Sequence, residues 1–237
     1  MVKRIIRKLV YGYKADSESM IAYLRKKGAR IGSDCIIFEP TNVSIDLSRP
    51  YLLEIGNKVQ ITKGVTILTH GYDWSVFKGL YGSVLGKAQK VVIGDNVFVG
   101  RNATIMGNVH IGNNVIIGAN AVVTKDIPEN SVVAGNPARV ISSLEDYYKK
   151  RMDLQLCEAK LLVCEYYKAF GTTPPPREEL REFFWLFTPR GAYVDNVVFD
   201  DVMNLLGNRE ESYDAFNSSK PLFENYEAFL DYCMADE

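Results

Sequence analysis

The sequence predicts a mainly β protein in which short strands wind into a stacked coil, with helices before and after the coil. Three observations carry this prediction: aliphatic residues recur every six positions over residues 93–123, glycines follow most of them, and the apolar spacing turns helical on both sides. A helix repeats its apolar face at about 3.6 residues and a two-faced strand at two, so neither produces this period. Short strands joined by tight turns do.

The six-residue repeat is unbroken in the middle of the chain. Its members are Ile93, Val99, Ile105, Ile111, Ile117 and Val123. A second run in the same phase lies upstream at Ile55, Ile61 and Ile67, and a shorter one starts at Ile31 and Ile37. Three such units are expected to close one triangular coil of about 18 residues, and stacked coils bury one continuous aliphatic column.

Glycines and asparagines stand where such a coil would turn its corners. Gly56, Gly94, Gly100, Gly112 and Gly118 directly follow an aliphatic member of the repeat, and Asn57, Asn96, Asn113 and Asn114 lie close behind. Because these two residue types tolerate positive φ, both sets are expected to supply positive-φ corner positions.

The repeat divides the chain into three parts. Residues 1–30 have helical apolar spacing and are predicted to form an N-terminal helical cap. Residues 31–141 form the predicted coil, interrupted by an excursion loop at 71–90. Residues 142–237 are predicted to be an α-helical C-terminal extension, whose first long helix stops near Gly171.

Composition narrows the function classes. The chain has 237 residues, is 47% hydrophobic, and has no uninterrupted apolar stretch of the roughly 20 residues that a bilayer span requires. Charges interrupt the first ten residues, so no secretory signal is expected and a cytoplasmic location is the default. Four scattered cysteines without a CxxC pair favour neither disulfides nor a metal site. Residues 1–144 hold 18 Lys and Arg against 10 Asp and Glu, which suits an anionic small ligand; no nucleic-acid partner is expected.

His70 stands where the repeat breaks. The units pass through Ile67 to His70 and then stop until Val91, and the interruption holds Tyr72 and Trp74 among its four aromatic residues. Loops thrown out from a rigid scaffold are frequent sites of function. Two interpretations stay open from position alone: His70 anchors the loop by a hydrogen bond, or it acts as a general base. The other histidine, His110, lies inside a regular unit and is expected at the surface.

Four stretches, taken in order, resemble the hexapeptide-repeat acetyltransferases, in particular the branch that O-acetylates sugars and capsular polysaccharides. They are Ile67-Leu-Thr-His-Gly-Tyr-Asp-Trp74, Ile93-Gly-Asp-Asn-Val-Phe-Val-Gly100, Ile117-Gly-Ala-Asn-Ala-Val-Val-Thr-Lys-Asp126 and Val133-Ala-Gly-Asn-Pro-Ala-Arg139. The resemblance implies a left-handed parallel β-helix, a homotrimer with intersubunit active sites, acetyl-CoA as co-substrate and a saccharide acceptor.

The resemblance also implies roles for individual residues. His70 would be the catalytic base for direct acetyl transfer, and a backbone N–H near Gly100 or Arg101 would steady the oxyanion. The implied cofactor-binding residues are Phe98, Gly100, Arg101, Gly118, Ala119, Thr124, Lys125 and Arg139. The implied acceptor-binding residues are Tyr72, Asp73 and Trp74. A backbone carbonyl or a carboxylate such as Asp73 would orient the imidazole.

Two departures and two alternatives qualify this assignment. Phe98 stands where tryptophan is frequent in this branch, so stacking survives but an indole N–H donor is lost. Gly71 stands where antibiotic-modifying relatives tend to have proline, which favours a saccharide over the alternative of a xenobiotic or antibiotic acceptor. The other alternative is a non-catalytic β-helix that serves as a binding scaffold. A zinc enzyme of this shape needs about three histidine ligands and the chain has two, so no metal is expected.

Overall fold

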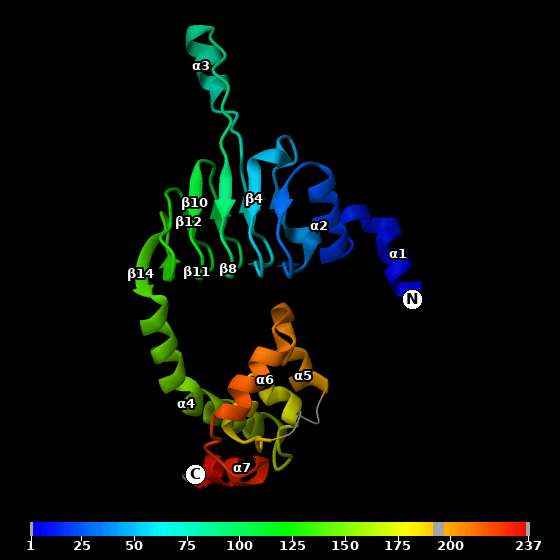
Figure 1. The fold of residues 1–237 in the computed structure, drawn as a ribbon, viewed down its shortest axis with the longest axis vertical. Helices are drawn as coiled ribbons and strands as arrows, with labels where there is room; N and C mark the ends of the chain where they lie inside the picture. Colours follow the sequence, from blue (N-terminus) through cyan, green and yellow to red (C-terminus); the bar gives the residue numbers. More distant parts are fainter. Residues whose placement is uncertain (1, 192–196, 236–237) are drawn as a thin grey trace. The chain divides into compact units, whose positions relative to one another are not determined.

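The computed structural model describes residues 2–191 and 197–235, so Met1, residues 192–196 and residues 236–237 of the predicted cap and extension lie outside the described residues. The chain forms two compact units, Met1–Tyr147 and Tyr148–Glu237. Figure 1 shows the first unit in blue to green as a stack of strands and the second in green to red as helices.

Two helices precede the strands where the sequence predicted one helical segment. They are α1 (Val2–Tyr11) and α2 (Ser17–Lys26), with a 3-10 turn at Gly12–Lys14 between them. The break follows from Gly12, whose φ is +57°, and from Asp16, whose side chain accepts a 2.8 Å hydrogen bond from the Ser19 N–H and so caps α2. The buried side chains of α2 belong to the same core as the coil.

Three sheets build the coil, and the chain visits them in turn. Sheet A holds β1 (Arg30–Ile31), β4 (Leu53–Ile55), β7 (Val91–Ile93) and β10 (Val109–Ile111). Sheet B holds β2 (Ile36–Ile37), β5 (Gln60–Ile61), β8 (Val97–Val99), β11 (Val115–Ile117), β13 (Ser131–Ala134) and β14 (Arg139–Ser143). Sheet C holds β3 (Ser44–Ile45), β6 (Thr66–Ile67), β9 (Thr104–Ile105) and β12 (Val122–Val123). All pairings are parallel except that of β13 with β14, so parallel winding through three sheets is confirmed. Short 3-10 turns at Pro40–Asn42 and Pro50–Leu52 lie in the first coil.

The period of six becomes a set of stacked aliphatic columns. Ile55 pairs with Ile93 and Ile93 with Ile111 in sheet A, and Ile67 pairs with Ile105 in sheet C. These side chains are between 0 and 5% exposed. Burying an aliphatic side chain of this size contributes roughly 1.5–3 kcal/mol, so the columns are the main source of stability in the coil.

The prediction that the corner glycines adopt positive φ is wrong. Positive φ is confirmed at the predicted Asn96 and Asn114 and occurs also at Asn102, Asn108, Asn120 and Asn130. The predicted Asn57 and Asn113, and the glycines Gly56, Gly94, Gly100, Gly112 and Gly118, do not adopt it. Glycine is required there because stacked coils approach closely: a Cβ at Gly94 would lie 2.9 Å from the carbonyl carbon of Gly112. Asparagine therefore turns the corners, and glycine lets the next coil come near.

The interruption at 71–90 is a projection with a helix that the sequence did not predict. This helix, α3 (Trp74–Tyr81), buries none of its residues and extends away from the sheets in Figure 1. The two ends of the projection are joined, since His70 and Ala88 form an antiparallel bridge and the Gln89 N–H donates to the Thr69 carbonyl at 2.8 Å. Arg49 also donates to the Lys87 carbonyl at 2.8 Å. The projection therefore has a fixed base.

Helices fill the rest of the chain. The long helix α4 (Leu144–Phe170) follows β14, and Gly171 after it has a φ of +73°, as the predicted stop requires. The second unit continues with α5 (Val197–Met203), α6 (Arg209–Ser218) and α7 (Tyr226–Met234), and with 3-10 turns at Arg177–Leu180, Phe184–Leu186 and Leu205–Gly207. Phe184, Phe216 and Phe229 lie in its core. Across residues 2–191 and 197–235, no helix is both long and apolar enough to cross a bilayer.

Candidate active site

His70 lies just beyond the end of β6, and its neighbour in the preceding coil comes from just beyond β3. Because β3 and β6 pair with Ser44 opposite Thr66, the residues that follow both strands leave sheet C at the same corner. The Asp46 N–H still donates to the Ile67 carbonyl at 3.0 Å, which fixes the backbone of Asp46 beside the turn that carries His70. The coil thus brings two residues together that are 24 positions apart.

The carboxylate of Asp46 is the centre of a hydrogen-bond cluster. Its Oδ2 atom accepts from the Thr69 hydroxyl at 2.6 Å and from Nδ1 of His70. Its Oδ1 atom accepts from the Ser48 N–H at 2.9 Å and from the Ser48 hydroxyl at 2.7 Å. The side chain of Asp46 is 4% exposed and that of His70 is 23% exposed. A buried carboxylate therefore holds a partly accessible imidazole.

This cluster sets the proton positions on His70. Burial alone would raise the pKa of Asp46, but the hydrogen bonds from Thr69, His70 and Ser48 outweigh it and hold that pKa well below the usual range of a carboxyl group. Asp46 is thus ionised at neutral pH and accepts only. Because the ionised Asp46 carboxylate can only accept, Nδ1 of His70 is the protonated nitrogen and donates to it. The proton of the Ser48 hydroxyl is also donated to Asp46. In the neutral ring Nε2 then carries the lone pair, as a general base requires.

The predicted acceptor residues lie at the base of the projection. The Tyr72 ring meets the His70 ring edge-on, with centroids 5.2 Å apart, and Trp74 lies 6.0 Å from Tyr72. Tyr72 is exposed and Trp74 is half-buried. The Asp73 carboxylate is paired with the Lys87 ammonium at 3.6 Å. Tyr72 is thus beside the imidazole and Trp74 is next to Tyr72, whereas Asp46, in place of the suggested Asp73, orients the imidazole.

Sequence reasoning missed Asp46 because the first coil is irregular. From Ile37 to Ile45 the repeat takes eight positions and from Ile45 to Ile55 it takes ten, so a search by six skips β3. The available signal was local: Ser-Ile at 44–45 has the same order of a hydroxyl residue and an isoleucine as Thr-Ile at 66–67, with which it pairs. An acidic residue directly after an inward isoleucine, one coil before a histidine, marks the position.

The predicted cofactor-binding glycines are stacked on each other at the corner where the chain enters sheet C. The Gly100 N–H donates to the Ile117 carbonyl and the Gly118 N–H to the Val133 carbonyl, both at 2.8 Å. Stacking thus uses the Gly100 N–H, and of the two suggested oxyanion donors only Arg101 is left. Among the described residues, no hydrogen bond is made by the N–H of Arg101 or of Ala119. These two amides follow the two glycines in the same row.

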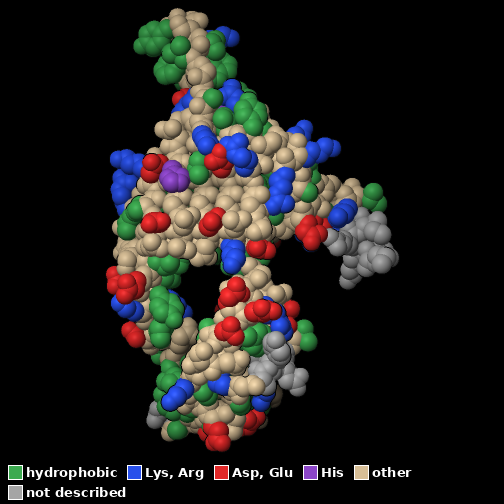
Figure 2. Space-filling view, in the orientation of Figure 1, with side chains coloured by type: hydrophobic (Ala, Val, Ile, Leu, Met, Phe, Trp, Pro, Cys, Tyr) green, Lys and Arg blue, Asp and Glu red, His purple; other side chains and the backbone are tan. Residues whose placement is uncertain are grey.

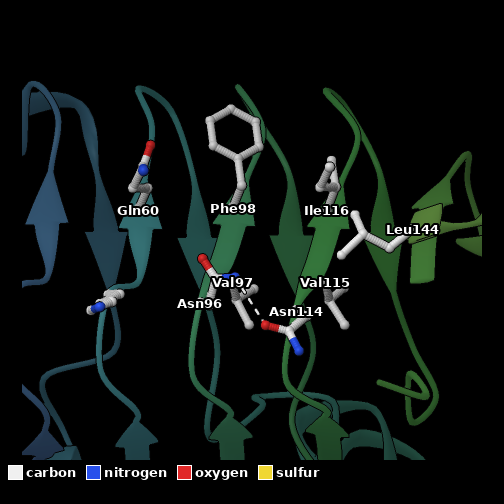
Figure 3. A pocket seen from close by; sticks show the side chains of 9 residues that line it. Gln60, Asn96, Val97, Phe98, Asn114, Val115, Ile116 and Leu144 are labelled. Carbon is white, nitrogen blue, oxygen red and sulfur yellow. Dashed lines mark hydrogen bonds between the residues drawn. The ribbon is translucent and has the colours of Figure 1, made fainter. Parts of the chain in front are cut away.

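Phe98 lies on the outer face of sheet B. It pairs with Gln60 on one side and Ile116 on the other, and it is 39% exposed. Figure 3 shows its ring standing between those two side chains, in a pocket that Leu144 also lines. Below it Asn96 donates to Asn114 at 2.9 Å, so the floor of the pocket is held by an amide ladder.

The predicted cationic residues are all at the surface. Thr124 and Lys125 follow β12 and lie in the same corner row as the residues that follow β6, two coils further along. Arg139 begins β14, and its guanidinium donates to the Ala138 carbonyl at 2.8 Å. Lys125, Arg139 and Arg101 are exposed. They are accessible to an anionic ligand, but Lys125 leaves sheet C, whereas Phe98 and Arg139 belong to sheet B.

His110 is exposed on β10. In the described parts of the chain, 2–191 and 197–235, no group of three His, Cys, Asp or Glu side chains is arranged to hold a metal ion. The site therefore consists of an Asp–His pair, the Tyr72 ring beside it with Trp74 next to that ring, and rows of small residues and cations on neighbouring corners.

The first unit is a three-sheet coil with an Asp–His pair where its repeat is interrupted, and the sequence of this unit matches a class of transferases. Residues 90–125 match the family described as bacterial transferase hexapeptide (six repeats). Protein CapG of Staphylococcus aureus is 45% identical over 130 residues, which are 55% of this chain and 74% of CapG. The putative acetyltransferase YvoF of Bacillus subtilis (strain 168) is 31% identical over 54% of this chain and 66% of its own length.

One solved structure adds a ligand-bound neighbour. It is a hexapeptide-repeat acetyltransferase of Vibrio cholerae O1 biovar eltor complexed with acetyl coenzyme A, with a TM-score of 0.45 and 23% identity over 60% of this chain and 86% of that one. From the extent of the match to CapG, the chain belongs to the hexapeptide-repeat transferase family. It is an acyltransferase.

Proposed function

We propose that this acyltransferase moves the acetyl group of acetyl-CoA to a hydroxyl of a saccharide, with His70 as the general base. The observation that carries the proposal is the Asp46–His70 pair, because it fixes the proton on Nδ1 and leaves the Nε2 lone pair for the acceptor hydroxyl. An imidazole that merely anchored a loop would not need a buried carboxylate behind it.

The proposed reaction is a direct transfer. Nε2 of His70 removes the proton of the acceptor hydroxyl as its oxygen attacks the thioester carbonyl carbon. The tetrahedral oxyanion is steadied by a backbone N–H, for which the Arg101 amide is the available candidate. The carbon–sulfur bond then breaks, and the CoA thiolate takes the proton from the His70 imidazolium. No nucleophilic side chain is required.

Three features support acetyl-CoA as the donor. Relatives of this chain are named acetyltransferases. In the row formed by Gly100, Arg101, Gly118 and Ala119, the Arg101 and Ala119 amides are unused, and the two glycines and the alanine have no large side chain that would keep a pantetheine arm away from the backbone. Exposed Lys125 and Arg139, with Thr124, offer charge for the nucleotide phosphates.

We further propose a trimer of left-handed coils with intersubunit active sites. The support is that Phe98 on sheet B and His70 beyond sheet C lie on different sides of one coil, so a second chain is needed to place a ring like Phe98 near an imidazole like His70. In this arrangement residues 1–30 cap the coil and residues 142–237 form an extension from it. Sedimentation showing an active monomer would contradict the trimer.

A saccharide is the proposed acceptor because exposed Tyr72 lies beside the imidazole and half-buried Trp74 lies next to Tyr72, so the two rings offer flat apolar faces to a sugar ring. Gly71 in place of proline also separates the chain from the antibiotic-modifying relatives it resembles. Asp73, held near Lys87, is a candidate for a hydroxyl contact.

The test is a thiol-release assay with purified protein and acetyl-CoA. The acceptor panel holds mono- and oligosaccharides, nucleotide sugars and small hydroxylated antibiotics, with His70→Ala as the control for unspecific hydrolysis. We expect CoA release with at least one saccharide. Release only with antibiotics would transfer the assignment to a xenobiotic acceptor, and acetyl-CoA binding without any release would indicate a binding scaffold.

A further inference from the structure

Helix α1 carries an apolar face that nothing covers in the described chain. Ile6, Leu9 and Val10 are 55%, 81% and 67% exposed, and Tyr11 after them is 52% exposed. The helix leads into the 3-10 turn at Gly12–Lys14, and the core of the first unit begins only with Tyr13 and α2. Aliphatic side chains this exposed on one short helix need a partner outside the first unit.

Charge is placed on the other side of the same helix. At 3.6 residues per turn, Leu9, Ile6 and Val10 fall within one arc of about 100°, while Arg7, Tyr11 and Lys8 fall within the opposite arc. The sequence of α1 also includes Lys3 and Arg4 and contains no acidic residue. Lys8 forms an ion pair with Asp16 at 3.9 Å. The helix is amphipathic and purely cationic.

This combination fits an anionic lipid surface better than a protein. A stable protein interface buries about 800 Å² per partner, and its core is depleted of lysine. Three aliphatic side chains bordered by cations offer too little area and too much positive charge for that. An amphipathic helix that lies in a lipid headgroup layer needs only a narrow apolar face, with Lys and Arg at the level of the lipid phosphates.

We propose that α1 binds the surface of membranes that contain anionic lipids, with Ile6, Leu9 and Val10 inserted between headgroups and Arg7 and Lys8 paired with phosphates. The helix lies in the surface and does not cross it. The function of the helix is to concentrate the enzyme at the bilayer, where the reaction then takes place.

Helix α3 provides an internal comparison. It is equally exposed, with Leu80 at 70%, but Lys78 is its one cation and it stands on the projection that starts at His70. Figure 2 shows its hydrophobic side chains gathered at the tip of that projection, with few charged ones among them. Without a cationic border α3 has no preference for anionic lipid, so α1 and α3 are expected to respond differently.

Cyclic symmetry would strengthen the contact. In the proposed trimer the three copies of α1 lie at one level along the symmetry axis, so they can reach one flat surface together. This gain rests on the trimer of the proposed function, whereas the contact of a single α1 does not.

The test is co-sedimentation of the full-length protein with vesicles of phosphatidylcholine alone or of phosphatidylcholine with about one third phosphatidylglycerol. We expect binding to the anionic vesicles, loss of that binding in high salt, and little binding to the neutral ones. Arg7→Glu/Lys8→Glu and Leu9→Ser/Val10→Ser should each reduce the bound fraction more than about tenfold. Lys150→Glu/Lys220→Glu, with the same change of charge at two exposed lysines, and Leu80→Ser should bind as the wild type does.

The assay does not depend on turnover, so its result is separable from that of the thiol-release assay. Equal binding to both kinds of vesicle, or none to the anionic ones, would overturn the proposal. A change of sedimentation coefficient in the α1 variants without lipid binding would overturn it too, because α1 would then pack against a second copy of the chain. CoA release with a free acceptor should be unchanged in all four variants, which also shows that they are folded.

Discussion

The coils of the first unit differ in regularity: the regular coils form the apolar core, and the irregular ones carry the candidate active site. Over residues 91–123 every unit has six residues, the strands of successive coils stand in register, and the one histidine, His110, is exposed on a strand. Over residues 31–70 the units vary in length, and Asp46, Ser48, Thr69 and His70 meet at one corner. Regular repetition builds an apolar column, whereas the irregular turns supply the polar groups that a proton transfer needs.

The physical reason lies in the corners. In a regular corner the backbone bonds to the next coil: the Asn114 N–H donates to Asp95 and the Asn130 N–H to Asn113, both at 2.9 Å. The longer turn after Ile45 leaves Ser48 N–H and the Ser48 hydroxyl to bond a side chain instead, at Asp46 Oδ1. Extra residues in a turn thus free donors that can hold a catalytic carboxylate.

The largest expected difference in turnover is between variants of the two histidines. His70→Ala should lower kcat by about a hundred- to ten-thousand-fold, the usual size of general-base effects, with the KM for acetyl-CoA nearly unchanged. His110→Ala, the matched change in a regular coil, should stay within about twofold. Steady-state thiol release measures both. Residual turnover of His70→Ala above about a tenth of the wild type would remove the base assignment.

Asp46→Asn tests the positioning residue with a smaller expected loss. The amide keeps the shape but no longer requires a proton on Nδ1, so kcat should fall at least about tenfold while the KM for acetyl-CoA stays the same. Replacing a residue with a purely structural role would instead lower the thermal midpoint without lowering kcat. If kcat of Asp46→Asn equals that of the wild type, Asp46 does not position the imidazole.

The regular coils predict a stability effect without an effect on chemistry. Gly94→Ala places a Cβ 2.4 Å from the Asn113 side-chain oxygen and 2.9 Å from the Gly112 backbone, so it should cost about 1–3 kcal/mol as overpacking does. Gly79→Ala in α3 meets nothing within 4 Å and should change stability by less than about 1 kcal/mol. Thermal denaturation by circular dichroism compares them. Equal midpoints would show that coil spacing does not require glycine.

The smallest effect is the pH dependence of stability. The folded-state pKa of Asp46 is depressed, so its contribution is fully present above the unfolded value of about 3.9 and is lost as the pH falls further toward the folded value. The difference in thermal midpoint between the wild type and Asp46→Asn should therefore be constant from pH 7 to pH 5 and shrink below about pH 4. A difference that grows on acidification would contradict an ionised Asp46.

The sequence predicted the structure correctly where one residue type has a single structural role. An inward aliphatic every six residues predicted the column from Ile93 to Val123, and the break before Val91 predicted where a projection leaves the coil. Prediction failed where two residue types can have the same role, since asparagine and glycine both tolerate positive φ. Only the distance between stacked coils shows that asparagine forms the corners and that glycine allows the close approach. Asp46 was not predicted because the coil before His70 is irregular, so the two residues that meet there are not separated by the regular spacing of the repeat.

The antiparallel strand β14 has a consequence for the behaviour of the protein in solution. A stack of parallel strands ends in open backbone donors and acceptors, and exposed strand edges invite pairing with other chains. Here β14 reverses direction on β13, the Val122 N–H and carbonyl bond to Gly135 and Ala138, and Ile127 forms a bridge with Ile111, so each of the three sheets is covered from within at this end. Deleting residues 139–143 is then a route from a coil of fixed length to one that polymerises end to end.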